Sequence, residues 1–380
     1  MTRRVMFYVQ HLLGIGHVKR AASLAKGMSE NGLDVTVVLG GVVVSDVDFG
    51  QAKCVYLPSA RALDQTFSTI VDSIGQPINK AWKTARCRQL LAIYNDIQPD
   101  VLIVELFPFG RRAFRFELLP LLDRARDDCF ITCSVRDVLV QKSDDNKTQQ
   151  AIDWVKHYFN LVLVHGDPQF IGFAETFPAA GEIEHLIRYT GYVVDRPVFD
   201  DGSLVGFDEI VVSTGGGAVG ADLIATALLA QPVSRHKNRT WRILVGHNLS
   251  EQQFLGFKDQ APAGVVVERA RSDFQTLLKN AAVSVSQGGY NTVMDILVNQ
   301  SRAVIVPFSG DGESEQTYRA RKFADQGRFV MIEQVGLTPN SLNLAIDQAL
   351  QSGTCPMVDP NLNGVGKSIE ILLDPHAMTG

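Results

Sequence analysis

The chain has 380 residues, of which 46% are hydrophobic and 20% charged, and its 36 basic and 41 acidic residues give a net charge of −5. This length is too great for one ordinary hydrophobic core and predicts two domains. The acidic balance argues against nucleic acid as the main partner, because nucleic-acid binding normally requires a basic surface. No apolar run approaches the roughly 18 residues that span a bilayer. The five cysteines are scattered without C-x-x-C spacing, which favours the reducing cytoplasm over a disulfide framework or a zinc site.

The first half of the chain alternates short β-rich segments with segments of helical periodicity. We predict strands at Val5–Val9, Asp34–Leu39, Val101–Val104, Phe130–Ser134 and Leu161–Val164. We predict helices at Val18–Glu30, Trp82–Asn95, Arg112–Ala125 and Asn146–Tyr158. Strands that alternate with helices indicate βαβ units and a parallel, doubly wound sheet.

The second half repeats this design. Strands are predicted at Ile210–Ser213, Trp241–Val245, Val265–Glu268, Val283–Ser286, Ala303–Pro307 and Phe329–Ile332. Helices are predicted at Ala221–Ala230, Phe274–Lys279, Thr292–Asn299, Gln316–Gln326 and Ser341–Ser352. The sequence therefore predicts an α/β protein with two Rossmann-like domains, 1–195 and 208–365. A linker at 196–207, marked by proline, glycines and acidic residues, joins them, and the tail at 366–380 could return to the first domain.

Two such domains that face each other create a cleft at the carboxyl ends of their strands, where ligands bind. The first of these loops carries Gly14 and Gly16, which allow close backbone approach, and a helix begins near His17. The spacing begins like the dinucleotide fingerprint G-x-G-x-x-G, but Lys19 occupies the third glycine position. NAD binding is therefore disfavoured.

A second glycine-rich loop opens the second domain, with Thr214, Gly215, Gly216 and Gly217 between a predicted strand and helix. Successive backbone N–H groups in such a loop form a concavity that can meet phosphate or sugar oxygens. A tight strand–helix turn is the alternative, although one glycine would suffice for it.

The third loop follows the strand at Val283–Ser286 and is the most informative. It consists of Gln287, Gly288, Gly289, Tyr290, Asn291 and Thr292. Two glycines at a helix N-terminus suit a pyrophosphate, because the helix dipole and the free amides stabilise it. Asp295 lies about one turn further along, where its carboxylate could accept hydrogen bonds from ribose hydroxyls.

A fourth loop, polar throughout, precedes the helix predicted to begin at Gln316. Glu315 and Gln316 could hydrogen-bond the hydroxyls of a donor sugar, and Arg319 could help to neutralise phosphate. The alternative is an ordinary first turn of a helix, where acidic residues are favoured anyway.

These residues resemble a known family. Ser286–Asp295, followed by Pro307, Glu315, Gln316 and Arg319, resembles the C-terminal signature of family 28 glycosyltransferases. The Gly14–His17 loop, Thr190–Tyr192 and the triple-glycine loop extend the resemblance into both halves of the chain. The resemblance implies a GT-B architecture, a UDP-sugar as co-substrate without a further cofactor, and inverting transfer without a metal.

The resemblance also implies roles for individual residues. Asp295 takes the position of the ribose-binding carboxylate, where Glu is usual, and Glu315 and Gln316 take the paired Gln positions that face the donor sugar. The backbone near Arg271 lies beside the nucleobase. Gln287 stands where the family often has Arg.

Displacement at the anomeric carbon requires a base for the proton of the acceptor hydroxyl. His17 is our first candidate, because a histidine near a helix N-terminus tends to stay neutral. Glu105, at the end of a predicted strand, is the second candidate, as the base or as the partner that orients His17. A capping or packing role for His17, and a structural role for Glu105, remain the alternatives.

Two further segments have more than one interpretation. Arg111 and Arg112 lie in an aromatic and basic segment that could receive an anionic or lipid-linked acceptor, or rest on an anionic membrane surface. They could equally be solvated arginines at the start of a helix. Gly364–Ser368 resembles the end of a phosphate-binding P-loop, but Asn361 occupies its first glycine position.

The sequence thus predicts a cytoplasmic glycosyltransferase, at the inner face of the membrane if the acceptor is lipid-linked. It would transfer a sugar from a UDP-sugar to a hydroxyl acceptor, which could be a glycan, a lipid-linked molecule or a component of the cell envelope. A UDP-sugar epimerase or a nucleotide-sugar hydrolase of the same fold is one alternative, and a non-catalytic nucleotide-sugar-binding protein is another.

Overall fold

The computed structural model describes residues 2–12, 16–44, 47–63, 69–139, 144–194, 202–215, 220–310, 315–351 and 359–373. The chain forms two compact units. The first comprises Met1–Val193 together with Pro360–Gly380, and the second comprises Val194–Asp359. The sequence places the end of the second domain at residue 365, within the segment that the structure assigns to the first unit.

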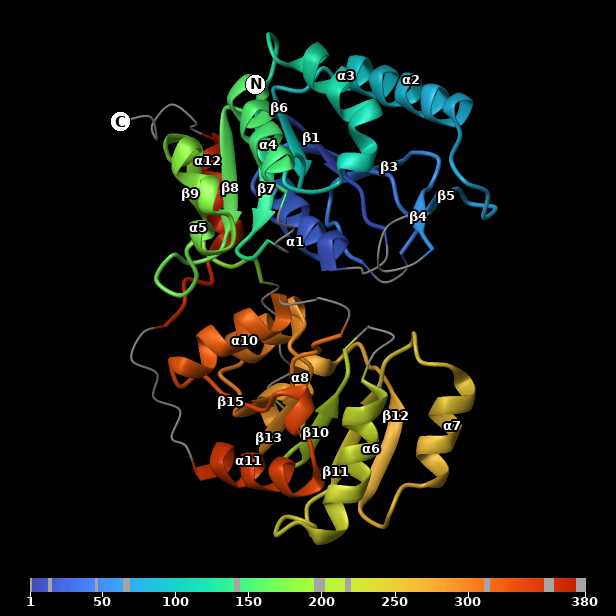
Figure 1. The fold of residues 1–380 in the computed structure, drawn as a ribbon, viewed down its shortest axis with the longest axis vertical. Helices are drawn as coiled ribbons and strands as arrows, with labels where there is room; N and C mark the ends of the chain where they lie inside the picture. The colour runs from blue at the N-terminus through green and yellow to red at the C-terminus, as the bar shows by residue number, and fades with distance from the viewer. Residues whose placement is uncertain are drawn as a thin grey trace. The chain divides into compact units, whose positions relative to one another are not determined.

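The first unit is built on a parallel sheet in the order β3-β2-β1-β6-β7-β8-β9 (Figure 1). Its strands are β1 (Arg4–Val9), β2 (Asp34–Leu39), β3 (Lys53–Tyr56), β6 (Val101–Glu105), β7 (Phe130–Arg136), β8 (Leu161–His165) and β9 (Ile187–Tyr189). Two short strands that follow β3 in the sequence, β4 (Arg61–Ala62) and β5 (Ile70–Val71), form a separate antiparallel pair. The central strands are continuous apolar runs because helices cover both faces of a parallel sheet.

Helices cover both faces of this sheet. Its α-helices are α1 (Gly16–Glu30), α2 (Lys80–Ile97), α3 (Arg115–Ala125), α4 (Asp145–Tyr158), α5 (Phe173–Thr176) and α12 (Gly364–Leu373), with 3₁₀ turns at η1 (Arg112–Phe114) and η2 (Pro178–Leu186). Met6 and Tyr8 of β1 belong to the core that α2, α3 and α4 complete. Phe7, on the opposite face, belongs to the core that α1 and α12 complete.

Helix α12 is the segment that resembles the end of a P-loop, and it serves the first unit as a structural helix against α1. The chain reaches it through a close approach to the segment after β9. The backbone N–H of Tyr192 donates to the carbonyl of Asn361 at 2.7 Å, and that of Gly364 donates to the carbonyl of Tyr192 at 3.0 Å. Gly364 has no room for a side chain there, since a Cβ would lie 2.6 Å from the backbone of Gly191 and Tyr192.

The second unit has its own parallel sheet in the order β12-β11-β10-β13-β14-β15. The strands are β10 (Ile210–Ser213), β11 (Trp241–Val245), β12 (Val265–Arg269), β13 (Val283–Ser286), β14 (Ala303–Ile305) and β15 (Val330–Met331). Its helices are α6 (Ala221–Ala230), α7 (Glu251–Asp259), α8 (Phe274–Asn280), α9 (Tyr290–Val298), α10 (Glu315–Asp325) and α11 (Pro339–Gln351), with 3₁₀ turns at η3 (Gln231–Val233) and η4 (Gln334–Gly336). Helices α6 and α11 pack on one face, and Leu277 of α8 packs against Val211 and Leu244 on the other.

The predicted fold class of two parallel-sheet α/β domains is confirmed. Two of the elements that the sequence analysis missed carry weak local signals. Strand β3 lies at a sheet edge with exposed or half-buried side chains, and α7 has no buried residue, so neither shows a clear apolar pattern. Within the part of the chain that the structure describes, no helix has the length and apolar character needed to cross a membrane.

Each sheet reverses its strand order at one point, between β1 and β6 in the first unit and between β10 and β13 in the second. In open α/β sheets, ligands bind outside the carboxyl ends of the strands at such a switch point. The loops after these four strands are therefore where each unit should hold its functional residues.

We expect Gly364→Ala to destabilise the first unit by about 1–3 kcal/mol, because the new methyl group would meet backbone that cannot move away. Gly181→Ala is the matched control in the same unit, since a Cβ there would meet nothing within 4 Å. Urea unfolding of both variants measures the difference. Equal midpoints for the two would show that the return of α12 does not depend on close packing at Gly364.

Candidate active site

The switch point of the first unit brings together the two predicted catalytic residues. Glu105 is the last residue of β6, and His17 is the second residue of α1, which follows β1. His17 Nδ1 lies 2.9 Å from Glu105 Oε1. The Glu105 side chain is completely buried and that of His17 is largely buried. The structure therefore places the Glu105 carboxylate within hydrogen-bond distance of the His17 imidazole.

The Glu105 carboxylate is surrounded by donors. Arg20, one turn after His17 on α1, also contacts Oε1, and the Ser134 hydroxyl donates to Oε2 at 2.7 Å. Burial by itself would raise the pKa of Glu105, but the charge of Arg20 and the hydrogen bonds from His17 and Ser134 lower it to about 2. Glu105 is thus ionised at any physiological pH.

His17 is held neutral. Burial, reinforced by the positive charge of Arg111, lowers its pKa to about 3 despite the favourable contact with Glu105. An ionised carboxylate can only accept, so the hydrogen of the neutral imidazole is on Nδ1 and Nε2 has a free lone pair. Arg20 lies 3.4 Å from the same Nδ1, but the shorter contact to the carboxylate assigns the hydrogen. Nε2 is the atom that can accept a proton.

The two arginines predicted to bind an acceptor have different surroundings. Arg111 donates to the carbonyl of Gln10 at 2.6 Å from the left-handed conformation (φ 58°), and burial lowers its pKa to about 10. It lies near enough to His17 to depress the pKa of that imidazole. Arg112 instead stacks on Trp154 at 4.9 Å and hydrogen-bonds α4 through Lys147 and Gln150. Only Arg111 of the two is brought to the site around His17.

The second unit gathers its glycine-rich loops in the same way. Ser213 and Ser286 are register partners at the ends of β10 and β13, so the loops that follow these strands lie side by side. A Cβ on Gly215 would lie 3.6 Å from the hydroxyl of Thr292, and Gly215 has a φ of +65° that suits glycine. Thr214 is buried, and its hydroxyl accepts the backbone N–H of Gly246 at 3.3 Å. Gly14, Gly216 and Gly217 lie outside the described residues.

The paired glycines before α9 have two different surroundings. A Cβ on Gly288 would meet Ile305 and Pro307 at 3.2–3.3 Å, so this glycine allows close packing on β14 and the residues after it. A Cβ on Gly289 would come no closer than 4.0 Å to any atom, so its surface is open. Gly289 is the N-cap of α9. The backbone N–H groups of Tyr290, Asn291 and Thr292 precede the first intrahelical hydrogen bond, which Val293 donates to Gly289. An anion can approach these groups over Gly289.

Three further predicted donor residues, Asp295, Arg271 and Gln287, also lie in the second unit. Asp295 is half-buried on α9 and accepts a hydrogen bond from Gln275 of α8 at 2.9 Å, a partner that the sequence analysis missed. Arg271 pairs with Asp273 at 2.6 Å, which holds its backbone after β12. Gln287 is buried next to Gly220. A Cβ added to Gly220 would lie 3.1 Å from the amide carbon of Gln287.

Glu315 and Arg319 bond to each other. Their side chains form an ion pair of 2.8 Å, Arg319 is completely buried, and its guanidinium lies 5.0 Å from the centre of the Tyr290 ring. The expectation that Arg319 contacts phosphate thus differs from the structure, in which it supports α9 from beneath Tyr290. Gln316 accepts the backbone N–H of Phe308 at 3.2 Å through its amide oxygen.

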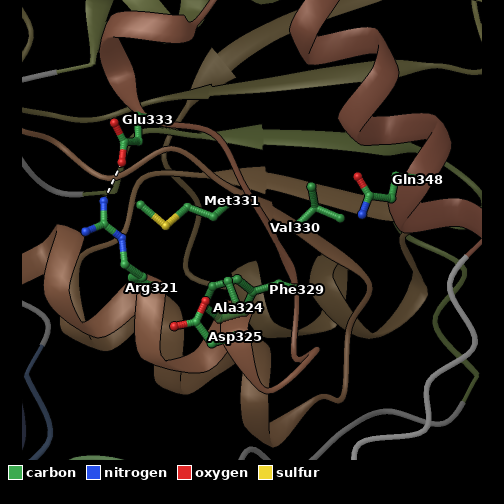
Figure 2. A pocket seen from close by; sticks show the side chains of 8 residues that line it. All are labelled: Arg321, Ala324, Asp325, Phe329, Val330, Met331, Glu333 and Gln348. Atoms are coloured by element: carbon green, nitrogen blue, oxygen red, sulfur yellow. Dashed lines mark hydrogen bonds and ion pairs between the residues drawn. The ribbon is translucent and has the colours of Figure 1, made fainter.

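A separate hollow of about 360 Å³ lies at the β15 edge of the second unit (Figure 2). Its walls come from α10, β15 and α11, and Arg321 pairs with Glu333 across its rim. None of the predicted site residues lines it. The candidate site therefore rests on the strand-end loops, not on this hollow.

Solved structures of the GT-B class share this architecture. The chain resembles CalG4, the calicheamicin glycosyltransferase, with 15% identity over 100% of this chain and 96% of that chain and a TM-score of 0.63. It resembles MurG of Acinetobacter baumannii with 16% identity over 98% and 99% of the two chains and a TM-score of 0.60. At these identities the likeness establishes the fold. The chain is a two-domain protein of the GT-B class.

The C-terminal half of the chain matches a family model. Residues 210–359 match the glycosyltransferase family 28 C-terminal domain, so the resemblance to family 28 is confirmed. Among curated relatives, a UDP-N-acetylglucosamine--N-acetylmuramyl-(pentapeptide) pyrophosphoryl-undecaprenol N-acetylglucosamine transferase of Gloeothece citriformis is 32% identical over 20% of this chain and 21% of its own length. The enzyme of the same name from Thermotoga neapolitana is 23% identical over 50% and 53%. The chain thus matches between about a fifth and about half of the length of these relatives.

Three buried histidines make the stability of the fold sensitive to acid. Burial is the first cause in each case, and it lowers the pKa of His11 to about 4 and those of His17 and His165 to about 3. The unfolded chain takes up these protons near pH 6.5, so stability is full above that pH and falls as the pH drops toward 3. At pH 5 each histidine costs up to about 2 kcal/mol of unfolding free energy.

Urea unfolding at pH 7.5 and pH 5.0 measures this loss. Glu105 does not add to the difference in unfolding free energy between these two pH values. A carboxylate with a lowered pKa loses its contribution to stability only below about pH 4.5. In His165→Asn the difference between the two pH values should shrink by up to about 2 kcal/mol, because one of the three groups is gone. An equal stability of the parent protein at both pH values would contradict neutral burial of the histidines.

Proposed function

We propose that this protein transfers a sugar from a UDP-sugar to a hydroxyl acceptor, with inversion at the anomeric carbon and without a metal ion. The observation that carries this proposal is the pairing of His17 with the buried, ionised Glu105 at the switch point of the first unit. A neutral imidazole whose Nδ1–H is held by a carboxylate presents Nε2 as a base. The family 28 domain of the second unit supports a nucleotide sugar as the other substrate.

In the proposed step the acceptor oxygen attacks the anomeric carbon while its proton passes to His17 Nε2. The bond between that carbon and the diphosphate oxygen breaks, and its electron pair leaves with the nucleoside diphosphate. Attack opposite the leaving group inverts the anomeric centre. The imidazolium that forms is stabilised by Glu105, whose negative charge is already in place.

The leaving diphosphate gains its stabilisation from α9. The N–H groups that begin this helix and the open surface of Gly289 suit the developing charge, and prearranged donors of this kind are among the largest contributors to catalysis. Asp295, oriented by Gln275, would accept from the ribose, and the NH₂ of Gln316 would donate to the sugar. Glu315 would act through Arg319 and Tyr290 to support the same helix end.

The acceptor is proposed to be anionic. Arg111 is a half-buried cation beside the proposed base, and a negative group on the acceptor would offset the cost of its partial burial. The curated relatives carry a pyrophosphoryl-undecaprenol acceptor in their names, and a lipid-linked diphosphate would meet this requirement here. Such an acceptor would bring the protein to the cytoplasmic face of a membrane.

His17→Ala and Glu105→Gln should each lower kcat by about 10²- to 10⁴-fold, the usual contribution of a positioned base. UDP affinity should not change, because the nucleotide is bound by residues of the second unit. Turnover of UDP-sugars with a panel of lipid-linked and soluble hydroxyl acceptors measures the first effect, and calorimetry with UDP measures the second. Release of free sugar or of an epimer without any acceptor would contradict transfer.

Asp295→Ala and Gln316→Ala should weaken nucleotide binding, UDP through Asp295 and the UDP-sugar through Gln316. We expect a loss of about 1–3 kcal/mol for Asp295→Ala, because a ribose hydroxyl loses a charged hydrogen-bond partner. Asp325→Ala, which removes an acidic group that lines the hollow of Figure 2, is the matched control. Unchanged affinity in Asp295→Ala, or tighter binding of thymidine diphosphate than of UDP by the parent protein, would overturn the proposed donor.

A further inference from the structure

The hydrogen bonds of the His17–Glu105 pair continue across the sheet. The Ser134 hydroxyl on β7 lies 2.7 Å from Glu105 Oε2 and 3.0 Å from Nε2 of His165 on β8. His165 Nδ1 lies 2.9 Å from the hydroxyl of Thr190, the residue after β9. Ser134, His165 and Thr190 have no exposed surface. Three adjacent parallel strands and the residue that follows a fourth thus contribute to one buried chain of hydrogen bonds that ends at the proposed base.

The register of the sheet explains why these residues meet. Glu105 and Ser134 are partners across β6 and β7, and His165 is the last residue of β8, paired with Arg136 two residues beyond Ser134. Residues near the carboxyl ends of parallel strands meet at the same edge of a sheet. The chain of hydrogen bonds therefore lies on the same edge as the loop that carries His17.

The chemistry of the groups sets the direction of each hydrogen bond. Ionised Glu105 can only accept, so Ser134 donates its single hydrogen to Oε2. His165 Nε2 must then donate to the Ser134 oxygen. Because a neutral imidazole has one hydrogen, His165 Nδ1 accepts from the Thr190 hydroxyl. The single hydrogen of that hydroxyl then points to His165 and not to the Gly191 carbonyl, which lies 2.8 Å away. Every donor in the chain points toward Glu105, and His17 Nδ1–H meets the same carboxylate on its other oxygen.

We propose that Ser134 and His165 are positioning residues for the transfer reaction, and that they act through Glu105 to hold His17 in the tautomer whose Nε2 accepts the proton. This inference rests on the proposed function for its catalytic consequence. Arg20 and His17 both bind Oε1, whereas Ser134 holds Oε2 from the opposite side. Without that hold, the carboxylate is free to turn toward Arg20 and away from the imidazole.

A purely structural role explains the buried hydrogen bonds of Ser134, His165 and Thr190 less well. A buried polar group is costly unless it is hydrogen-bonded, and an apolar side chain would fill the position of His165 without that cost. The bonds that the structure gives to the His165 ring run to Ser134 and Thr190. The charged and titratable groups that act on these residues from the surrounding elements are Arg20 and His17 of α1, Arg111 after β6, and Cys133 and Arg136 of β7.

The test measures tautomers as well as turnover in the full-length protein. In the parent protein, histidine-selective nitrogen NMR should show His17 protonated on Nδ1 and His165 protonated on Nε2. In Ser134→Ala, His17 should lose its single Nδ1–H form, and kcat should fall by about 10- to 100-fold, part of what a positioned base contributes. The KM for the donor should stay unchanged. Ser134→Thr keeps the hydroxyl and should restore both properties.

Thr132→Val is the matched control. Thr132 lies on the same face of β7 as Ser134 and is equally buried. Its hydroxyl donates to the carbonyl of Leu161 at 3.2 Å and takes no part in the hydrogen bonds that lead to Glu105. It should lose stability without any change in the His17 tautomer or in kcat. His165→Asn provides a second disruption if Ser134→Ala does not fold.

The outcomes separate the two proposals. A folded Ser134→Ala or His165→Asn with the parent tautomer and the parent kcat would overturn the positioning role and leave the proposed function intact. Absence of turnover in the parent protein with every donor and acceptor would overturn the proposed function, while the tautomer of His17 in Ser134→Ala would still decide the inference. A His17 protonated on Nε2 in the parent protein would overturn the inference directly.

Discussion

Glu105 carries a full negative charge at a position that solvent does not reach, and much of the first unit is arranged around that charge. A buried carboxylate costs several kcal/mol unless charged and hydrogen-bonding partners surround it. Here the partners come from separate elements, with His17 and Arg20 on α1 and Ser134 on β7. The parallel register of β6 and β7 and the start of α1 at Gly16 must both be correct for these groups to meet. The position of the proposed base is thus a consequence of how the sheet stabilises one charge.

Both units place their candidate functional residues at the point where the strand order of the sheet reverses. A parallel sheet that reverses its strand order leaves two neighbouring loops diverging at one edge, and a helix N-terminus lies beside them. In the first unit this geometry surrounds an acid–base pair, because Glu105 ends one of the two strands and His17 begins the helix after the other. In the second unit the same place is occupied by glycines, and Gly289, over which the space is open, precedes α9 without a side-chain cap. The difference lies in the residues of the loops and not in the fold.

The sequence predicted the strands β2, β10, β11 and β13 and the helix α6 with the bounds that the structure has, because apolar runs and helical periodicity are local signals. His17 and Glu105 could be named as candidates because both follow predicted strands. Ser134 and His165 have the same position at strand ends, and that rule could have found them as well. The pairing of Glu315 with Arg319 was also available from their spacing of one helical turn. Gln275 had no such signal, since it lies on a different helix from Asp295.

By itself the sequence determined that the chain forms two parallel α/β domains and that its polar and glycine-rich loops follow strands, since periodicity and strand ends are encoded within short segments. Only the tertiary structure decided which of these residues meet. His17 and Glu105 are 88 positions apart, and the strands that carry Ser134 and His165 are joined by a crossover helix. Their contacts depend on strand order and register, which are properties of the assembled sheet. The candidate donor residues Gly288, Gly289 and Asp295 could be grouped from the sequence alone, because they belong to one turn and one helix.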